Sequence, residues 1–189
     1  MVRRFADRDE VITEIGELFR EHGYPATSLS LITERTGLGK GSLYHLFPGG
    51  KPEMGEAVLT NIHKWFEDNV FLPLIDESDP QTAISHMFEA VTTYFRSGRR
   101  ICLIGAMALD ASRDPFAQRI SDYFQRWLET LALALNRAGL LPDDARQLAR
   151  EIVLGIQGAL VLARAIDDDS VFIDEIGRLR KRSLTLPQR

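Results

Sequence analysis

The sequence of 189 residues predicts an all-α protein, and three observations support this fold class. Apolar side chains recur at the three- and four-residue spacing of a helix face along most of the chain. Glycine and proline separate these stretches at intervals that suit helices of ordinary length. No stretch alternates apolar and polar residues as a half-buried strand does. We expect about nine helices, with the first three forming a small N-terminal group.

Apolar stripes and boundary residues place these helices in order. The first carries Val11, Ile12, Ile15, Leu18 and Phe19 and ends at Gly23. The second and third lie between Thr27 and Leu46. A linking helix is expected over 52–70, with Pro52 in its first turn and Pro73 after its end. The remaining helices are expected over 80–97, 101–111, 114–139 and 142–166, and from Ser170 onward.

The segment from Thr27 to Lys51, TSLSLITERTGLGKGSLYHLFPGGK, predicts two short helices joined by a tight turn. Thr27 or Ser28 can cap the first, because a side-chain hydroxyl accepts a hydrogen bond from an unpaired backbone N–H. Gly37 stands where helices commonly end in a left-handed residue. In the second helix, at about 40–46, Leu43 and Phe47 are expected to face inward.

The outward face of this second helix suits a phosphate-lined groove. It carries Lys40, Gly41, Ser42, Tyr44 and His45. Between Arg35 and Lys51 there are three Lys or Arg, one His and no acid. A helix-turn-helix places its second helix in the major groove of DNA while neighbouring groups hold phosphates. The plainer interpretation is a helical hairpin with a small basic face.

The segment resembles the DNA-binding domain of the TetR family of one-component repressors. The matching residues are Ala26, Thr27, Ser28, Ile32, Gly37, Leu38, Lys40, Gly41, Ser42, Leu43, Tyr44, Phe47 and Lys51. Thr33, Gly39 and Leu46 depart from the family pattern, and Leu46 stands where a phosphate contact is often found. The motif PGGK at 48–51, with ICLIGAMALDA at 101–111 and QGALVLARA at 157–165, resembles the LmrA/YxaF-like branch.

The resemblance implies a division of the chain into two domains. Residues 1–50 form the helix-turn-helix domain, and residues 51–189 form an effector-binding and dimerisation domain that starts with the linking helix. Residues expected to contact double-stranded DNA are Thr27, Ser28, Lys40, Gly41, Ser42, Tyr44, His45 and Lys51. Arg3, Arg4 and Arg8 precede the first helix, and they either contact phosphates or form a solvated end.

A second surface is expected on the last two helices. Small residues on one side of the helix at 142–166 let two helices approach closely, and two copies would then form a four-helix bundle about a two-fold axis. The expected dimer residues are Gly155, Gly158, Ala159, Leu162, Ile166, Phe172 and Ile176. The alternative is packing within one protomer. A dimer presents two recognition helices, and the family is dimeric through these helices.

A third set of residues, in the middle helices, is a candidate ligand pocket. Phe66, Met87, Phe88, Met107, Tyr123 and Trp127 are either ordinary core or the lining of an apolar cavity, and Gln157 is the candidate polar contact. In the LmrA/YxaF-like branch such pockets take aromatic or amphipathic compounds. The resemblance implies a ligand-responsive repressor that binds a palindromic operator as a homodimer and is released by such an effector.

Composition and motifs restrict the other functional classes that the chain could belong to. The single cysteine, Cys102, leaves no internal disulfide or thiolate metal site, and His22, His45, His63 and His86 lack metal-ligand spacing. No phosphate loop or nucleophile elbow is present, so we expect neither an enzyme nor a cofactor. Without a signal peptide or an apolar run of about 20 residues, the expected compartment is the cytoplasm. The net charge of −4 leaves DNA binding possible, because phosphates respond to charge within about 8–10 Å. The alternative function is a helical small-molecule- or protein-binding module that does not bind DNA.

Overall fold

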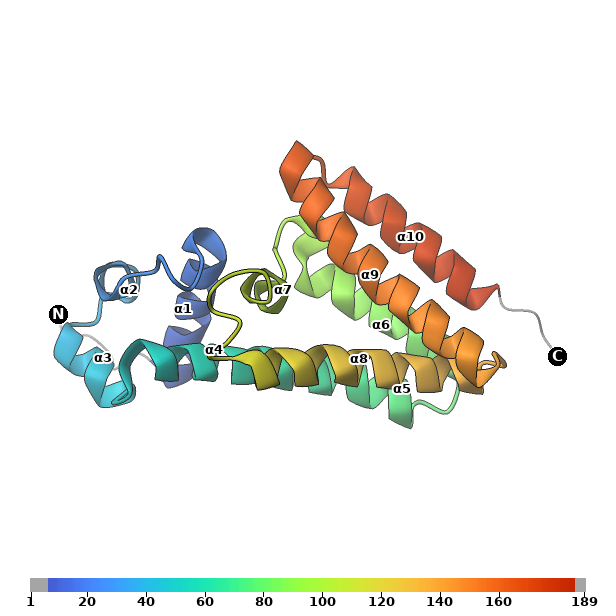
Figure 1. The fold of residues 1–189 in the computed structure, drawn as a ribbon, viewed down its shortest axis with the longest axis horizontal. Helices are drawn as coiled ribbons and strands as arrows, with labels where there is room; N and C mark the ends of the chain where they lie inside the picture. The colour runs from blue at the N-terminus through green and yellow to red at the C-terminus, as the bar shows by residue number, and fades with distance from the viewer. Residues whose placement is uncertain (1–6, 186–189) are drawn as a thin grey trace. The chain divides into compact units, whose positions relative to one another are not determined.

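A computed structural model describes residues 7–185, and every regular element in that range is helical (Figure 1). The prediction of an all-α fold is confirmed. The elements are α1 (Arg8–His22), α2 (Leu29–Thr36), α3 (Lys40–Leu46), α4 (Gly50–Phe66), a π-helical turn (Glu67–Phe71), α5 (Leu72–Asp76), α6 (Pro80–Tyr94), a 3-10 turn (Arg96–Gly98), α7 (Leu103–Met107), α8 (Ala117–Arg137), α9 (Pro142–Ile166) and α10 (Ser170–Leu184). Arg3 and Arg4 lie outside the described residues. None of the helices within 7–185 is long and apolar enough to cross a membrane.

The chain forms two compact units. The first contains the chain up to His63 together with Leu103–Ile120, and the second contains Lys64–Cys102 together with the chain from Ser121 onward. Both α4 and α8 therefore begin in the first unit and end in the second. The domain boundary expected at residue 50 remains a prediction.

In the first unit the apolar stripe of α1 supports the helical hairpin. Val11, Ile12, Ile15, Leu18 and Phe19 are all buried. The hairpin contributes Ile32, Leu43 and Phe47, each no more than 1% exposed. Asp7 caps α1 by accepting a hydrogen bond from the N–H of Asp9 at 3.2 Å. The helix ends at Gly23, whose φ of +80° is readily adopted only by glycine.

The prediction that the linking helix runs over 52–70 and ends before Pro73 is wrong. Helical structure starts at Gly50 and continues through the π-helical turn into α5, with Pro73 in the first turn of α5. Proline removes one backbone donor from a helix, and the π-helical turn just before Pro73 changes the hydrogen-bond register at the point where that donor is missing. Asn69 donates a side-chain hydrogen bond to the Trp65 carbonyl at 2.8 Å, which satisfies a backbone acceptor where the helix widens.

The helix expected over 101–111 is reduced to α7, Leu103–Met107. The carboxylate of Asp110 accepts hydrogen bonds from the backbone N–H and the hydroxyl of Ser112. This local turn competes with helical backbone bonding, so the chain leaves the helix before Asp110. The next helix accordingly starts at Ala117 rather than at 114.

The core of the second unit is aromatic, and Phe66 lies at its centre. The rings of Trp65, Phe71, Tyr94, Phe95, Tyr123 and Trp127 have centroids 4.8 to 6.2 Å from that of Phe66. These rings come from α4, α6, α8 and the turns beside them. Three of these six pairs are edge-to-face, as the ring quadrupoles favour, and the other three are tilted.

Candidate nucleic-acid interface

The hairpin is built by local interactions that the sequence encodes. Ser28 caps α2 by accepting a hydrogen bond from the N–H of Leu31 at 3.2 Å. Gly37 ends α2 with a left-handed φ of +67°, and its N–H donates to the carbonyl of Thr33. Gly39 precedes α3 in an extended conformation, without a side-chain cap. The two short helices and their turn therefore form as expected.

The outward side chains of α3 are exposed as a group. Lys40, Gly41, Ser42, Tyr44 and His45 are all accessible, and Tyr44 is 47% exposed although it is a large aromatic residue. A Cβ atom built on Gly41 would meet no atom within 4 Å, so the surface is open at that point. Hydroxyls, a ring N–H and an ammonium group on one open helix face can bind phosphate oxygens and base edges.

Thr27 does not belong to this surface. Its side chain is fully buried, and its hydroxyl donates to the carbonyls of Gly23 at 2.8 Å and Leu18 at 3.3 Å. The expectation that Thr27 contacts DNA is corrected, because its hydroxyl anchors the loop before α2 onto the end of α1. Ser28 remains exposed at the start of α2.

Lys51 is also held inside the unit. Its ammonium donates to the carbonyl of Pro25 at 3.0 Å and lies 4.8 Å from the ring centroid of Tyr24. Partial burial lowers the pKa of the Lys51 ammonium below its ordinary value. Lys51 was expected to contact phosphate, but its side chain instead links the start of α4 to the loop between α1 and α2.

Two neighbouring charged residues have structural roles that sequence reasoning missed. Glu53 accepts a hydrogen bond from the N–H of Gly49 at 2.6 Å, close to the start of α4. The guanidinium of Arg8 lies 4.9 Å from the centroid of the Phe47 ring and 3.8 Å from the Glu53 carboxylate. An acid in the first turn of the linking helix, as in PGGKPE, was the available signal for such a cap.

The exposed apolar side chains of α9 and α10 form a second surface, which differs from the expected one. Phe172 and Ile176 are 0% and 7% exposed, so they pack inside the protomer and the expectation that they meet a partner is corrected. Gly155 packs within the protomer too, since a Cβ there would lie 2.7 Å from Glu175 Oε1 and 2.9 Å from Leu179 Cδ1. Ala159 is buried, whereas Gly158 is open.

Leu162 and Ile166 do lie on the surface, and three residues missed from the sequence join them. Leu154 is 71% exposed, Val161 65% and Ile173 52%. On α9 the exposed residues Leu154, Gly158, Val161, Leu162 and Ile166 follow the spacing of one helix face. We define the α9/α10 patch as these five residues with Ile173. The second apolar stripe on α9 was the signal that could have identified it.

The expected ligand residues occupy the cores of the two units. Phe66, Met87, Phe88, Tyr123 and Trp127 are buried in the second unit, and Met107 is buried in the first. Within the described residues, the buried Nε1 of Trp127 and Nε2 of Gln157 find no hydrogen-bond acceptor. An unsatisfied buried donor costs about 1–3 kcal/mol, so these two groups are candidates for a ligand contact. No group of three His, Cys, Asp or Glu in residues 7–185 has an arrangement that could hold a metal.

Comparison with known proteins agrees with this geometry. Residues 3–58 match the family described as bacterial regulatory proteins of the tetR family, and residues 80–176 match the C-terminal domain of LmrA/YxaF-like transcriptional regulators. A relative in Bacillus subtilis, the uncharacterized HTH-type transcriptional regulator YxaF, is 29% identical over 167 residues, which cover 86% of this chain and 87% of the relative.

Two solved structures have the same fold. A TetR transcriptional regulator from Legionella pneumophila aligns with a TM-score of 0.81 at 22% identity, covering 96% of this chain and 98% of that one. The TetR family regulator CifR, solved with 26-base-pair operator DNA, aligns with a TM-score of 0.77 at 19% identity, covering 98% and 100%. The chain therefore belongs to the TetR family of transcriptional regulators, with a C-terminal domain of the LmrA/YxaF-like type.

Proposed function

We propose that this chain is a cytoplasmic, ligand-responsive transcriptional repressor, which binds a palindromic operator as a homodimer and is released by a small aromatic or amphipathic effector. The observation that carries the proposal is the exposed face of α3 on a helix-turn-helix of the TetR family. Lys40, Ser42, Tyr44 and His45 supply donors and one positive charge, and Gly41 permits close approach. An exposed tyrosine one helical turn from an exposed lysine is better explained by a nucleic-acid partner than by a solvated surface.

The α9/α10 patch supports the homodimer. Large aliphatic side chains exposed together on neighbouring helices are unusual on a monomer, and an isologous dimer covers the same patch on both copies. Two copies present two α3 helices, which suits half-sites about one helical turn apart. A palindromic operator is the sequence that such a two-fold protein matches.

The aromatic core of the second unit supports the choice of effector. The rings around Phe66 offer an apolar environment, and the buried N–H groups of Trp127 and Gln157 lack hydrogen-bond acceptors, which a ligand could supply. A flat aromatic compound that carries a carbonyl or hydroxyl oxygen satisfies both needs. Among the proposed lining residues, Met107 is the least supported, because it belongs to the first unit.

Induction follows from preferential binding to one of two conformations. The effector binds better when α4 is tilted, and this tilt moves the two α3 helices out of register with successive grooves. A ligand with equal affinity for both conformations would leave operator binding unchanged, however tightly it bound. α4 is the appropriate element because its chain passes from the first unit into the second.

Selection of bound fragments from random duplex DNA tests the proposal. The expected result is a palindrome whose half-sites are about 10 base pairs apart, or a multiple of this. Recovery of no enriched sequence, with no salt-dependent binding to any duplex, would favour the alternative of a helical binding module without DNA. With the selected duplex in hand, saturating aromatic ligand should lower its affinity, and an unchanged dissociation constant would remove the induction claim.

A further inference from the structure

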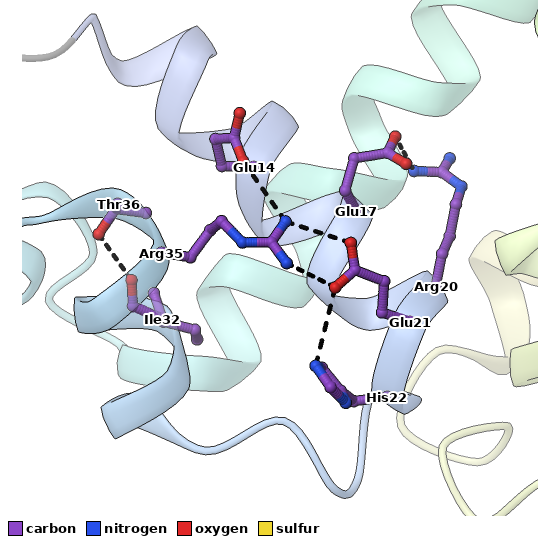
Figure 2. Close-up of polar contacts among 8 residues, drawn as sticks. All are labelled: Glu14, Glu17, Arg20, Glu21, His22, Ile32, Arg35 and Thr36. Carbon is purple, nitrogen blue, oxygen red and sulfur yellow. Dashed lines mark hydrogen bonds and ion pairs between the residues drawn. The ribbon is translucent and has the colours of Figure 1, made fainter.

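Arg35, in the last turn of α2, lies in the basic segment of the hairpin, but its guanidinium is engaged by acids of α1. Its guanidinium donates to both carboxylate oxygens of Glu21 on α1, with distances of 3.2 Å to Oε1 and 2.5 Å to Oε2. A second acid of α1, Glu14, has an oxygen 3.7 Å from Arg35 Nη1. Figure 2 shows the guanidinium directed at these two acids, which are two helical turns apart on α1. The fork-to-fork geometry fixes direction as well as distance.

The rest of α2 provides few other constraints. Of its eight residues, only Ile32 is fully buried. Beside the pair lies an open groove of about 380 Å³, whose lining includes Glu14 of α1 with Arg35 and Thr36 of α2. Apolar packing therefore does not fill this side of the contact. The helix is anchored before its start by Thr27, in its middle by Ile32 and at its end by Arg35.

The anchored end of α2 leads directly to the recognition helix. Three residues separate Thr36 from Lys40, and they are held in one conformation. The hydroxyl of Thr36 donates to the Ile32 carbonyl at 2.7 Å and accepts from the N–H of Leu38 at 3.3 Å. Gly37 has a fixed left-handed φ of +67°. A rotation of α2 about Ile32 is therefore passed on to α3.

We propose that Arg35 is a positioning residue for DNA recognition, which ties α2 to Glu21 and Glu14 of α1 and so fixes the angle at which α3 is presented, without contacting DNA. The proposal rests on the DNA-binding function proposed above. The pair is 36% to 47% exposed at its two side chains, and exposed ion pairs add little to folding stability. Its effect is therefore expected in the affinity of the folded protein for DNA rather than in its melting temperature.

The test uses Glu21→Gln, because simple electrostatics and the positioning role predict opposite changes in its affinity for DNA. Removing a negative charge near a polyanion should strengthen binding if only the local potential matters. Positioning predicts that Glu21→Gln weakens binding to the duplex selected by the wild-type chain by about tenfold, the value of about one base contact. The matched control is Glu34→Gln, which removes an exposed acid next to Arg35 in the sequence without removing its partner. It should leave binding unchanged or slightly tighter.

Arg35→Gln completes the experiment. It should weaken binding by a similar factor, and Arg35→Gln with Glu21→Gln should be no worse than either change alone. The slope of log K against log salt should equal that of the wild type, since each lost phosphate contact would reduce it by about 0.9. Circular dichroism should find each variant folded at the temperature of the binding assay.

Three results would overturn the positioning role. The first is tighter or unchanged binding by Glu21→Gln. The second is a reduced salt slope for Arg35→Gln, which would identify a direct phosphate contact. In the third, wild-type protein binds no duplex, so that the proposed function fails and the positioning role fails with it. The first two leave wild-type binding intact and are thereby distinguishable from the third.

Discussion

Gly55, in the first half of α4, is buried against two aromatic rings of the first unit. A Cβ atom there would lie 2.6 Å from Phe116 Cζ and 3.0 Å from Tyr24 Cε2. Those rings are in edge contact with each other, with centroids 5.1 Å apart, and Tyr24 also meets Phe19 of α1. Because Gly55 has no side chain, the rings of Phe116 and Tyr24 can pack against α4. The neighbouring Glu56 forms an ion pair with Arg119 at 3.1 Å.

Gly55→Ala should therefore destabilise the protein by overpacking. We expect a loss of about 1–3 kcal/mol in the free energy of unfolding, because two rings must shift to admit the methyl group. Urea denaturation followed by circular dichroism measures it. Gly177→Ala on α10 is the matched control, since its Cβ meets nothing within 4 Å, and it should stabilise by up to about 1 kcal/mol. Equal stability of Gly55→Ala and wild type would contradict the packing described.

At Asp79, a single capping residue makes the folding stability depend on pH. It caps α6, and the Thr82 hydroxyl, followed by the N–H groups of Thr82 and Gln81, holds the pKa of its carboxyl below the ordinary 3.8. A lowered pKa in the folded state means that the stabilisation is fully present above pH 3.8 and is lost as pH falls through the folded value.

The comparison for Asp79 is Asp79→Asn, which keeps a capping oxygen but does not titrate. The stability advantage of the wild type over this variant should shrink as the pH is lowered from about 6 to about 3. Urea midpoints across that range measure the difference between the two proteins. An advantage that stays constant down to the acidic end would show that the Asp79 carboxylate is not held as described.

Among the elements, α9 and α10 best illustrate the difference between a core face and an exposed apolar face, which we propose meets a second copy. α9 has two apolar stripes, of which the one carrying Ile152, Ile156 and Leu160 packs inside the protomer. The other is the α9/α10 patch. Phe172 and Ile176 lie on the inner face of α10, and a Cβ on Gly98 would lie 2.8 Å from Phe172 Cβ. Assembly and folding should therefore respond to different residues of the same helices.

Leu154→Lys with Leu162→Lys should give a folded monomer. Two ammonium groups in an apolar interface cannot be paired across a two-fold axis, so association is lost while the protomer core is untouched. Sedimentation or light scattering measures the mass. As the contrasting variant, Phe172→Ala should cost about 3–5 kcal/mol of folding stability because it opens a cavity in the core. A lysine variant that remains dimeric would place the interface elsewhere.

At the element scale, the sequence predicts whatever depends on near neighbours in the chain. The cap at Ser28, the turn at Gly37 and the inward side chain of Leu43 all follow from residue type and spacing. The same reasoning placed α9 at its observed bounds and the start of α10 at Ser170, and it extended α6 to 97 where the helix ends at Tyr94. Local chemistry was sufficient because each of these features is satisfied within one or two helical turns.

Features that depend on distant residues were not predictable. The hydroxyl of Thr27 donates to the carbonyl of Leu18 on α1 as well as to that of Gly23, and the engagement of Lys51 depends on Pro25, 26 residues earlier in the chain. The stop expected before Pro73 failed because the π-helical turn shifts the register there. An apolar stripe such as Phe172 and Ile176 cannot by itself indicate whether it meets its own protomer or a second copy.

On the scale of the whole molecule, three chain crossings connect the two units. The chain leaves the first unit after His63, returns at Leu103 and leaves again after Ile120. Segment 103–120, which includes the first turn of α8, thus belongs to the same unit as the helix-turn-helix. Phe116 and Arg119 in that segment contact Tyr24 and Glu56. The induction proposed above requires these covalent crossings to carry a change of conformation from the second unit to the first.

The central claim, that α3 enters duplex DNA, is tested by fluorescence anisotropy of a labelled operator duplex with wild-type protein and a Lys40→Ala, Tyr44→Ala variant. Both side chains are exposed, so the variant should fold and melt like the wild type. We predict salt-dependent binding by the wild type, and for the variant a loss of at least about tenfold in affinity with a shallower salt slope. Equal affinity of the two proteins for the same duplex would contradict the account.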